Sequence, residues 1–355
     1  GLGRGFDVYD QLLTPDRLHP LIYRTGILAG FTRFHVLRPA ERKWFRTVPS
    51  VLQWWSRTPA KPRFTWVHFY DPHFPYEPQP EFRKMTWPET PRFDQSVFEI
   101  AMMNAQGIHP ETSRIEEYKA LYHGEVAGVD AAVGHLVRAL QQSDRFQDTL
   151  IIVAADHGES LDEHDYYFAH GENLYDPSLN VPLLASFPRV IQSRLILPGQ
   201  TSLNTVPGII QSVLGIPLSD HDAEYCRTVA IQHEMLRGES PLKALGIKSF
   251  CETGAGVYTT AHEPSDDRIR MKKRGIRTHG AKLILDEDGT VSGYDLETDP
   301  GETRPGAPEG NNEFMELYGE LTEYIRAADP PDRQPVNLPD AEAIRQLRAL
   351  GYIDE

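Results

Sequence analysis

The feature that most constrains the fold is a long helical pattern followed by an apolar run without alternation. Apolar residues recur at spacings of three and four, which predicts one buried face on a helix. They are Ile115, Tyr118, Tyr122, Val126, Val129, Val133, Leu136 and Leu140. Residues 149–155 then show no polar alternation, as expected for a strand buried on both faces of a sheet.

Other segments continue this α/β pattern. Residues 63–71 form a β-branched and aromatic run that ends at Pro72, which predicts an earlier buried strand. Residues 181–187 predict a further strand, followed by a helix that ends near Gly215. Strands alternating with amphipathic helices favour an α/β fold with a mixed, largely parallel sheet flanked by helices.

The character of the chain changes near residue 246. Residues 281–286 and 290–296 flank a Gly-containing turn, which predicts an antiparallel hairpin. A last helix is expected over 341–350. We therefore expect a partial α/β catalytic domain over 1–245 and a small C-terminal antiparallel α+β subdomain with a tail helix over 246–355.

Charge and composition exclude some classes of protein. The net charge of −15 argues against a nucleic-acid partner, because phosphate contacts need clustered Lys and Arg. It allows an anionic substrate, since a metal ion and a few local cations can hold one anion. No apolar run reaches the roughly 18 residues of a membrane span. Cys226 and Cys251 allow one disulfide at most, and no Cys-based zinc site.

The strongest candidate site follows the apolar run of residues 149–155. Asp156 and His157 stand where ligands gather in open α/β sheets, beyond the carboxyl end of a strand. A carboxylate beside an imidazole suits a divalent cation, and Gly158 allows a sharp turn. In the alternative interpretation, Asp156 only caps the next helix.

Two further histidines are candidates for chemistry. His73 follows the end of a predicted strand and has Pro72 and Pro75 on its two sides, which limits its backbone freedom. His170 lies in an aromatic loop thirteen residues after His157. Each alone suits a structural role, but imidazoles near strand ends can also donate protons or bind anionic oxygens.

These motifs, taken in order, resemble those of the sulfatase family in the alkaline-phosphatase-like superfamily. The matching segments are residues 71–76 (DPHFPY), 122–130 (YHGEVAGVD), 156–161 (DHGESL), 180–184 (NVPLL), 275–278 (GIRT), 294–300 (YDLETDP) and 347–353 (LRALGYI). The resemblance implies an α/β hydrolase of sulfuric esters that depends on a metal ion. Its substrate would be a small-molecule or saccharide sulfate ester.

The resemblance also assigns roles to individual residues. Asp156 and His157 look like two ligands of the family's divalent metal ion, most often Ca²⁺, with Mn²⁺ or Zn²⁺ as alternatives. His73 looks like the residue that assists the leaving group. His170 sits where relatives place a Lys or His that touches the sulfate. The resemblance implies a periplasmic or extracellular location, which the residues themselves leave open.

One element of the family pattern is absent from the 355 residues. Sulfatases use a Cys or Ser in the motif Cys/Ser-x-Pro-x-Arg, oxidised to formylglycine, and no such motif occurs here. We therefore expect a truncated piece that lacks the upstream nucleophile and is inactive alone. Two alternatives stay open, namely a phosphate or phosphonate ester hydrolase or phosphoryl transferase of the same superfamily, and a non-catalytic binding protein on the same fold.

Overall fold

A computed structural model describes most of the chain as two compact units. It describes residues 42–57, 62–93, 95–191, 200–216, 249–252 and 273–328, and singly residues 8, 10, 194 and 196. The first unit comprises residues 1–97, 112–140 and 334–355, and the second comprises 98–111 and 141–333. The predicted boundary at 245–246 and the predicted helix over 341–350 lie outside the described residues.

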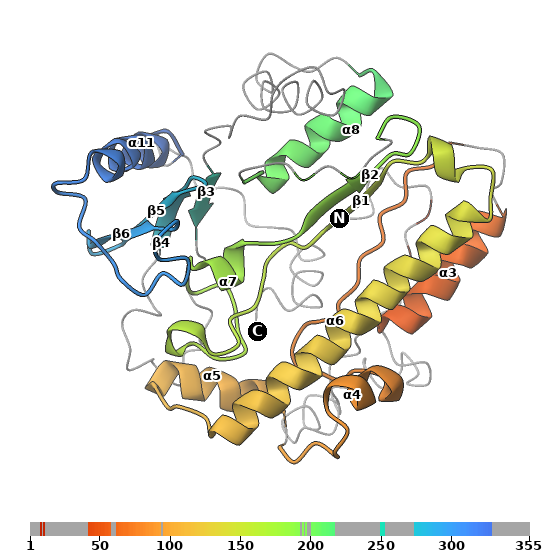
Figure 1. The fold of residues 1–355 in the computed structure, drawn as a ribbon, viewed down its shortest axis with the longest axis horizontal. Helices are drawn as coiled ribbons and strands as arrows, with labels where there is room; N and C mark the ends of the chain where they lie inside the picture. Colours follow the sequence, from red (N-terminus) through yellow and green to blue (C-terminus); the bar gives the residue numbers. More distant parts are fainter. Residues whose placement is uncertain are drawn as a thin grey trace, which may run out of the picture. The chain divides into compact units, whose positions relative to one another are not determined.

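The first unit is built around one long helix. Helix α6 (Thr112–Gln141) runs beside α3 (Trp44–Arg57), and α4 (Pro80–Thr86) lies beside its middle, near Gly124 (Figure 1). The indole of Trp44 packs against Gly128, where a Cβ would lie only 2.7 Å from Nε1. A residue without a side chain is therefore needed for α3 to approach α6 this closely.

The predicted buried stripe of α6 is only partly right. Tyr118 and Leu140 are buried as expected, but Val126 is 42% exposed. Two acidic residues that periodicity would place outside, Glu117 and Glu125, are buried instead. Their carboxylates accept hydrogen bonds from backbone N–H groups of the segment 77–93, and these bonds compensate for burying charge.

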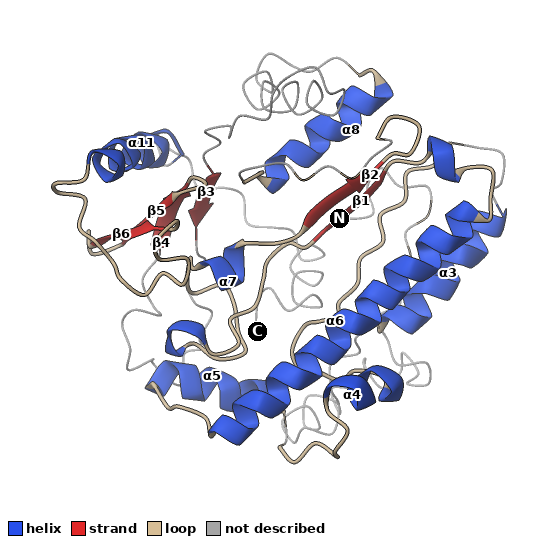
Figure 2. Ribbon diagram, in the orientation of Figure 1, coloured by secondary structure: helices blue, strands red, loops and turns tan. Residues whose placement is uncertain are grey.

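The second unit holds a strand pair and the helices near it. Strand β1 (Ile151–Ala154) confirms the predicted strand and pairs with β2 (Leu183–Ser186) in antiparallel register. Both strands are half-buried or exposed, so the expected burial on both faces is not seen for β1. Helices α5 (Val97–Gln106), α7 (Asp176–Leu179) and α8 (Val206–Leu214) complete this region (Figure 2). Helix α8 ends at the left-handed Gly215, as predicted.

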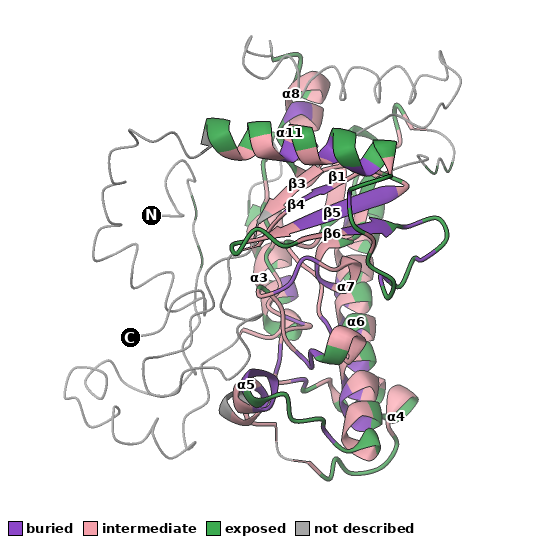
Figure 3. Ribbon diagram, turned by 90° about the vertical axis from the view of Figure 1, so that its left-hand side faces the viewer, coloured by how far each residue is buried: buried purple, intermediate pink, exposed green. Residues whose placement is uncertain are grey.

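The same unit contains a four-stranded antiparallel sheet in the order β3-β4-β5-β6. Its strands are β3 (Ser249–Glu252), β4 (Lys273–Arg277), β5 (Ala281–Asp286) and β6 (Val291–Asp295). The β5–β6 pair confirms the predicted hairpin. Helix α11 (Asn312–Ala328) buries Phe314, Leu317 and Leu321 against the sheet, and β5 is the most completely buried strand (Figure 3).

The predicted strand over 63–71 is wrong in the described structure. Residues 62–70 form no ladder with another described segment, although exposed and half-buried positions mostly alternate as they do in a strand. Phe64 and Trp66 are 59% and 70% exposed. An apolar run can suggest a buried strand, but burial requires a covering partner. Among the described residues, no helix is both long and apolar enough to cross a membrane.

Candidate active site

Asp156 and His157 lie directly beyond the carboxyl end of β1, as predicted. The His157 N–H donates to Asp156 Oδ1 at 3.0 Å, and His157 Nε2 lies 3.8 Å from the same oxygen. The Asp156 side chain is 55% exposed, and that of His157 is 33% exposed. Both are therefore accessible to an ion from solvent.

The ring nitrogens of His157 have different surroundings. Nδ1 lies 2.8 Å from the carbonyl oxygen of Gly158, an acceptor that requires a proton on Nδ1. The neutral ring then carries its lone pair on Nε2, the atom nearer to Asp156. A backbone acceptor on one ring nitrogen is a common way to orient a metal-binding histidine.

His170 stacks on His157. The two ring centroids are 3.7 Å apart with an interplanar angle of 21°. His170 Nδ1 lies 2.8 Å from Oε1 of Glu159, whose side chain is only 6% exposed. Because an ionised carboxylate only accepts hydrogen bonds, Glu159 fixes Nδ1 as a donor and sets the orientation of the ring. The structure thus brings Asp156, His157 and His170 together, and adds Glu159 to them.

Helix α7 packs against the turn at residues 156–158. The Gly158 N–H donates to the carbonyl oxygen of Ser178 at 2.8 Å. A Cβ at position 158 would lie 2.0 Å from the carbonyl oxygen of Pro177, so any side chain would displace the helix or the turn. Ser160 pairs with Ala169 in an antiparallel bridge, which closes the loop between the two histidines.

Helix α7 is itself anchored by buried charges from the C-terminal sheet. We call Asp176, Arg277, Lys282 and Glu302 the Lys282 cluster. Lys282 Nζ lies 2.5 Å from both Asp176 Oδ1 and Glu302 Oε1, and Arg277 binds the Asp176 carboxylate through two nitrogens at 2.9 and 2.6 Å. The Lys282 and Glu302 side chains have no exposed surface.

The carboxyl groups of this cluster have opposite pKa shifts. Burial acts to raise the pKa of Asp176, but hydrogen bonds from Arg277 and Lys282 outweigh it and lower the pKa. Burial dominates at Glu302 and raises its pKa despite the contact with Lys282. Burial also raises the pKa of the nearby Cys251 thiol, a free cysteine, to about 11.

His73 lies in the first unit, in a loop with two cis peptide bonds at Asp71–Pro72 and Phe74–Pro75. Its backbone N–H donates to the Tyr70 carbonyl oxygen at 3.0 Å, and its Nδ1 lies 2.6 Å from the Phe74 carbonyl oxygen. That acceptor requires a proton on Nδ1. The predicted stiffness of this loop is consistent with these contacts.

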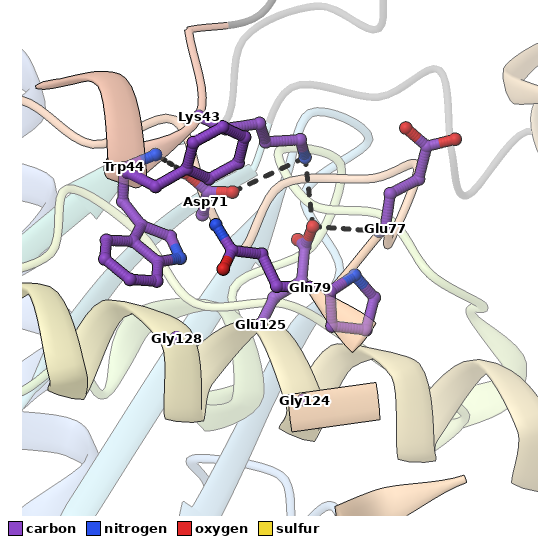
Figure 4. A pocket seen from close by; sticks show the side chains of 10 residues that line it. Lys43, Trp44, Asp71, Glu77, Gln79, Gly124, Glu125 and Gly128 are labelled. Carbon is purple, nitrogen blue, oxygen red and sulfur yellow. Dashed lines mark hydrogen bonds and ion pairs between the residues drawn. The ribbon is translucent and has the colours of Figure 1, made fainter. Parts of the chain in front are cut away.

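A second set of charged residues supports the His73 loop, and we call Lys43, Asp71 and Glu125 the Lys43 cluster (Figure 4). Lys43 Nζ lies 3.4 Å from Asp71 Oδ1 and 3.0 Å from Glu125 Oε1. The other Asp71 oxygen accepts the Trp44 N–H at 3.0 Å, at the start of α3. The cavity between these groups has a volume of about 10 Å³, roughly that of one water molecule.

The residues at the end of β1 fit one part of a divalent metal site. Asp156 supplies an accessible carboxylate and His157 supplies an imidazole nitrogen with its lone pair available. Within the described residues, no group of three or more His, Cys, Asp or Glu is arranged to hold an ion. A hard cation that prefers six or more oxygen ligands needs further ligands than these two.

The supporting residues could not be found from the sequence. Asp71, Glu125, Glu159 and Arg277 lie inside matched segments, but nothing in those segments names their partners. Lys282 lies 106 residues from Asp176, and Glu125 lies 82 residues from Lys43. Lys43, Asp176, Lys282 and Glu302 lie outside the matched segments.

Comparisons with known proteins point to one family. Residues 41–216 match the family model described as Sulfatase. The chain is 26% identical over 238 residues to arylsulfatase K of Bos taurus, which is 64% of this chain and 38% of that protein. It is 28% identical over 297 residues to an endo-4-O-sulfatase of Bacteroides thetaiotaomicron, which is 78% of this chain and 53% of that protein. The chain therefore spans only about a third to a half of the length of these relatives.

Solved structures share the fold of this chain, which is the alkaline-phosphatase-like α/β fold. One was determined in complex with its substrate D-glucosamine-2-N,6-O-disulfate; it matches with a TM-score of 0.58 and 17% identity over 83% of this chain and 72% of that one. Another is the phosphonate monoester hydrolase of Agrobacterium radiobacter, with a TM-score of 0.58 and 21% identity over 82% of this chain and 62% of that one. The family match identifies residues 41–216 as a sulfatase domain, in agreement with the ordered motifs.

Proposed function

We propose that the intact protein hydrolyses sulfuric esters with the aid of a divalent metal ion, which the family resemblance implies to be Ca²⁺. The observation that carries the proposal is the cluster of Asp156, His157 and His170 at the end of β1. When bound, the cation would neutralise the non-bridging oxygens of the ester. Asp156 and His157 would be two of its ligands.

The histidines have separate tasks in this proposal. His170, oriented by Glu159, would bind oxygens of the transferred sulfate through Nε2. His73, protonated on both ring nitrogens, would donate the Nε2 proton to the departing oxygen and become neutral, while its Nδ1–H stays bound to the Phe74 carbonyl oxygen. No residue of the 355 is assigned as nucleophile, because no Cys/Ser-x-Pro-x-Arg motif occurs among them.

The proposal extends to the substrate and the domain plan. A sulfated saccharide is the proposed substrate, since one solved neighbour holds a sulfated glucosamine. The catalytic domain would cover residues 1–245 with a largely parallel sheet, and the α+β subdomain would cover 246–355. The antiparallel sheet β3–β6 with α11 supports the second part of this plan.

The test is a linear free-energy comparison on the intact protein. We expect metal-dependent hydrolysis of aryl sulfates, with a higher kcat/KM than for aryl phosphates and phosphonates of the same leaving group. His73→Ala should slow esters of basic leaving groups most, because protonation matters most for a basic oxygen. His170→Ala should slow all esters about equally, since it would act on the transferred group.

His123→Ala provides the matched control, because His123 is an exposed histidine on α6. An equal loss across the series for His73→Ala would contradict its role as general acid. Faster turnover of phosphonates would favour the phosphonate hydrolase. Absence of turnover, with sulfate esters still bound, would favour a non-catalytic binding protein. The 355 residues alone are expected to show no turnover of any of these esters.

A further inference from the structure

Residues 160–170, which we call the His170 loop, fold back on themselves in the second unit. The N–H of Ser160 donates to the Ala169 carbonyl oxygen at 3.0 Å, and the N–H of Ala169 donates back to the Ser160 carbonyl oxygen at 3.3 Å. Glu159 and His170 directly flank this pair, and the Glu159 carboxylate lies 2.8 Å from His170 Nδ1. The orientation of the His170 ring therefore depends on how the rest of the loop is held.

Three residues of the His170 loop have a left-handed backbone conformation, although none of them is glycine. Their φ angles are 59° at His164, 56° at Asp165 and 49° at Phe168. Such a conformation costs free energy, most of all for a bulky side chain, and it persists only where surrounding contacts hold it. The loop therefore needs contacts with the rest of the unit to keep this shape.

One side chain of α5 holds the loop backbone three residues before His170. Asn104 is only 4% exposed, and it uses both polar atoms of its amide on the backbone of Tyr167. Asn104 Oδ1 accepts the Tyr167 N–H at 2.9 Å, and Asn104 Nδ2 donates to the Tyr167 carbonyl oxygen at 2.8 Å. The amide thus takes the place of a neighbouring strand, because it satisfies the backbone donor and acceptor of one residue.

A second contact to Tyr167 differs from this one in burial. His109, which follows α5, has its Nδ1 2.7 Å from the Tyr167 hydroxyl oxygen, and its side chain is 64% exposed. Water can replace the His109 contact if that side chain is removed. Loss of the buried Asn104 amide instead leaves the Tyr167 N–H and carbonyl group without partners. Asn104 is therefore the contact on which the shape of the loop depends most.

We propose that Asn104 is a positioning residue, which holds the loop in the shape that presents His170 to the transferred sulfate group. The inference rests on the proposed function in one respect, since His170 is assigned there to the oxygens of the sulfate. The contacts lead from Asn104 through the backbone of Tyr167 to the pair of Ser160 and Ala169. That pair in turn keeps Glu159 within reach of the His170 ring. Asn104 takes no part in the chemistry itself.

Nitrogen NMR of the His170 ring in the 355-residue chain tests the positioning without any turnover. The ring signals are assigned by their loss in His170→Gln, and they report which ring nitrogen carries the proton. At about pH 8, where an ordinary imidazole is neutral, we expect wild type to keep the proton on Nδ1, facing Glu159. Asn104→Ala should release the ring into an exchanging mixture of both tautomers. Unchanged ring signals in Asn104→Ala would overturn the proposal.

Thr205→Val is the matched control, because it also removes a buried side-chain hydrogen bond in the second unit. Thr205 is 2% exposed, and its hydroxyl donates to the Ser202 carbonyl oxygen at 2.7 Å, outside the His170 loop. The His170 signals of this control should match those of wild type, and an equal change in both variants would contradict the proposal. If Asn104→Ala does not fold, Asn104→Asp replaces it. That variant keeps the acceptor for the Tyr167 N–H but loses the donor, so it should release the ring in part.

Kinetics of the intact protein separate this proposal from the proposed function. Asn104→Ala should lower kcat/KM for aryl sulfates by about 10- to 100-fold, mainly through kcat and equally for all leaving groups. In a His170→Ala background the same change should cost less than about threefold, because the ring that it positions is gone. Equal losses in both backgrounds would show a merely structural role and sink the proposal. No turnover of any aryl sulfate, together with Asn104-dependent ring signals, would reject the sulfatase assignment and keep Asn104 as the residue that orients His170.

Discussion

The Lys282 and Lys43 clusters have the same arrangement of charges but differ in how deeply the lysine is buried. In each, one lysine bridges two carboxylates behind a predicted site segment. Lys282 is fully buried and lies 2.5 Å from both partners, whereas Lys43 is 17% exposed and lies 3.0 and 3.4 Å from its partners. The deeper cluster supports the turn of Asp156 and His157 through α7, and the shallower one supports the His73 loop.

This difference indicates how strongly each segment depends on its lysine. An ion pair removed from water adds little net stability when complete, but deleting one partner leaves a buried charge uncompensated. A partly exposed pair can recover solvation by admitting water. We therefore expect the turn at the end of β1 to tolerate loss of its lysine far less than the His73 loop does.

The largest effect is expected for Lys282→Met. It leaves Glu302 fully buried without a cation, and the free energy of unfolding should fall by about 3–5 kcal/mol. Urea denaturation measures this, and Lys273→Met is the control, since the Lys273–Asp286 pair bridges β4 and β5 with side chains 12% and 23% exposed. A loss no greater than that of the control would break the comparison.

A large effect is also expected on the reactivity of Cys251. With its pKa raised to about 11, its thiolate fraction at pH 8 should be roughly two-hundred-fold below that of an ordinary thiol with a pKa near 8.5. The rate of reaction with a chromogenic disulfide measures it, in a Cys226→Ser background. Loss of the Lys282 charge alone would raise the pKa of Cys251 further, so Lys282→Met should speed the reaction only by opening the cluster to solvent, whereas Lys43→Met should not change it. Rapid labelling of the native wild-type chain would show that the cluster is not closed.

A smaller effect is expected for Lys43→Met. Asp71 keeps its hydrogen bond from the Trp44 N–H, and Glu125 keeps that from the Glu77 N–H. The free energy of unfolding should therefore fall by about 1–2 kcal/mol, in the range of a hydrogen bond to a charged group. Its control is Lys43→Arg, which retains the charge. A loss equal to that of Lys282→Met would show that burial depth does not decide the cost.

The smallest effect is the pH dependence of the Lys282 cluster, because its two pKa shifts oppose each other. Glu302 has a pKa raised above 4.5, so its contribution to stability falls as pH rises through that shifted value. Asp176 has a pKa lowered below 3.8, so its contribution is lost as pH falls through the lowered value. Melting temperatures between pH 3 and 7 should show Glu302→Gln flattening the slope above pH 4.5 and Asp176→Asn flattening it below pH 4. Unchanged slopes would contradict both assignments.

The sequence predicted local features well, but it predicted poorly which distant residues hold the helices and the site in place. The strand before Asp156, the hairpin over β5 and β6 and the left-handed Gly215 each have signals within a few residues. The placement of Glu117 and Glu125 on the buried side of α6 could not be predicted, because helical periodicity assigns charges to solvent. Both carboxylates can be buried because they accept hydrogen bonds from backbone N–H groups about 25 and 48 residues away in the sequence.

Predicted burial also failed where it depended on partners. Residues 63–71 and 149–155 have strand composition, yet Trp66 is exposed and β1 is only half-buried. Composition describes what a segment prefers, whereas burial is a property of everything packed against it. The same limit applies to the site: the family resemblance assigned Asp156, His157 and His170 to one active site, but it did not reveal the carboxylate that orients His170.

The anchoring of α7 has a consequence for dividing this protein into parts. The region matched by the family ends at residue 216, whereas both cations that bind Asp176 come from residues 277 and 282. A gene fragment cut at that homology boundary would keep every predicted ligand and histidine, yet would leave the Asp176 carboxylate without its cations. The boundary of the family match therefore differs from the boundary of the cooperatively folding unit. We expect only the longer fragment to keep the turn of Asp156 and His157 in its native conformation.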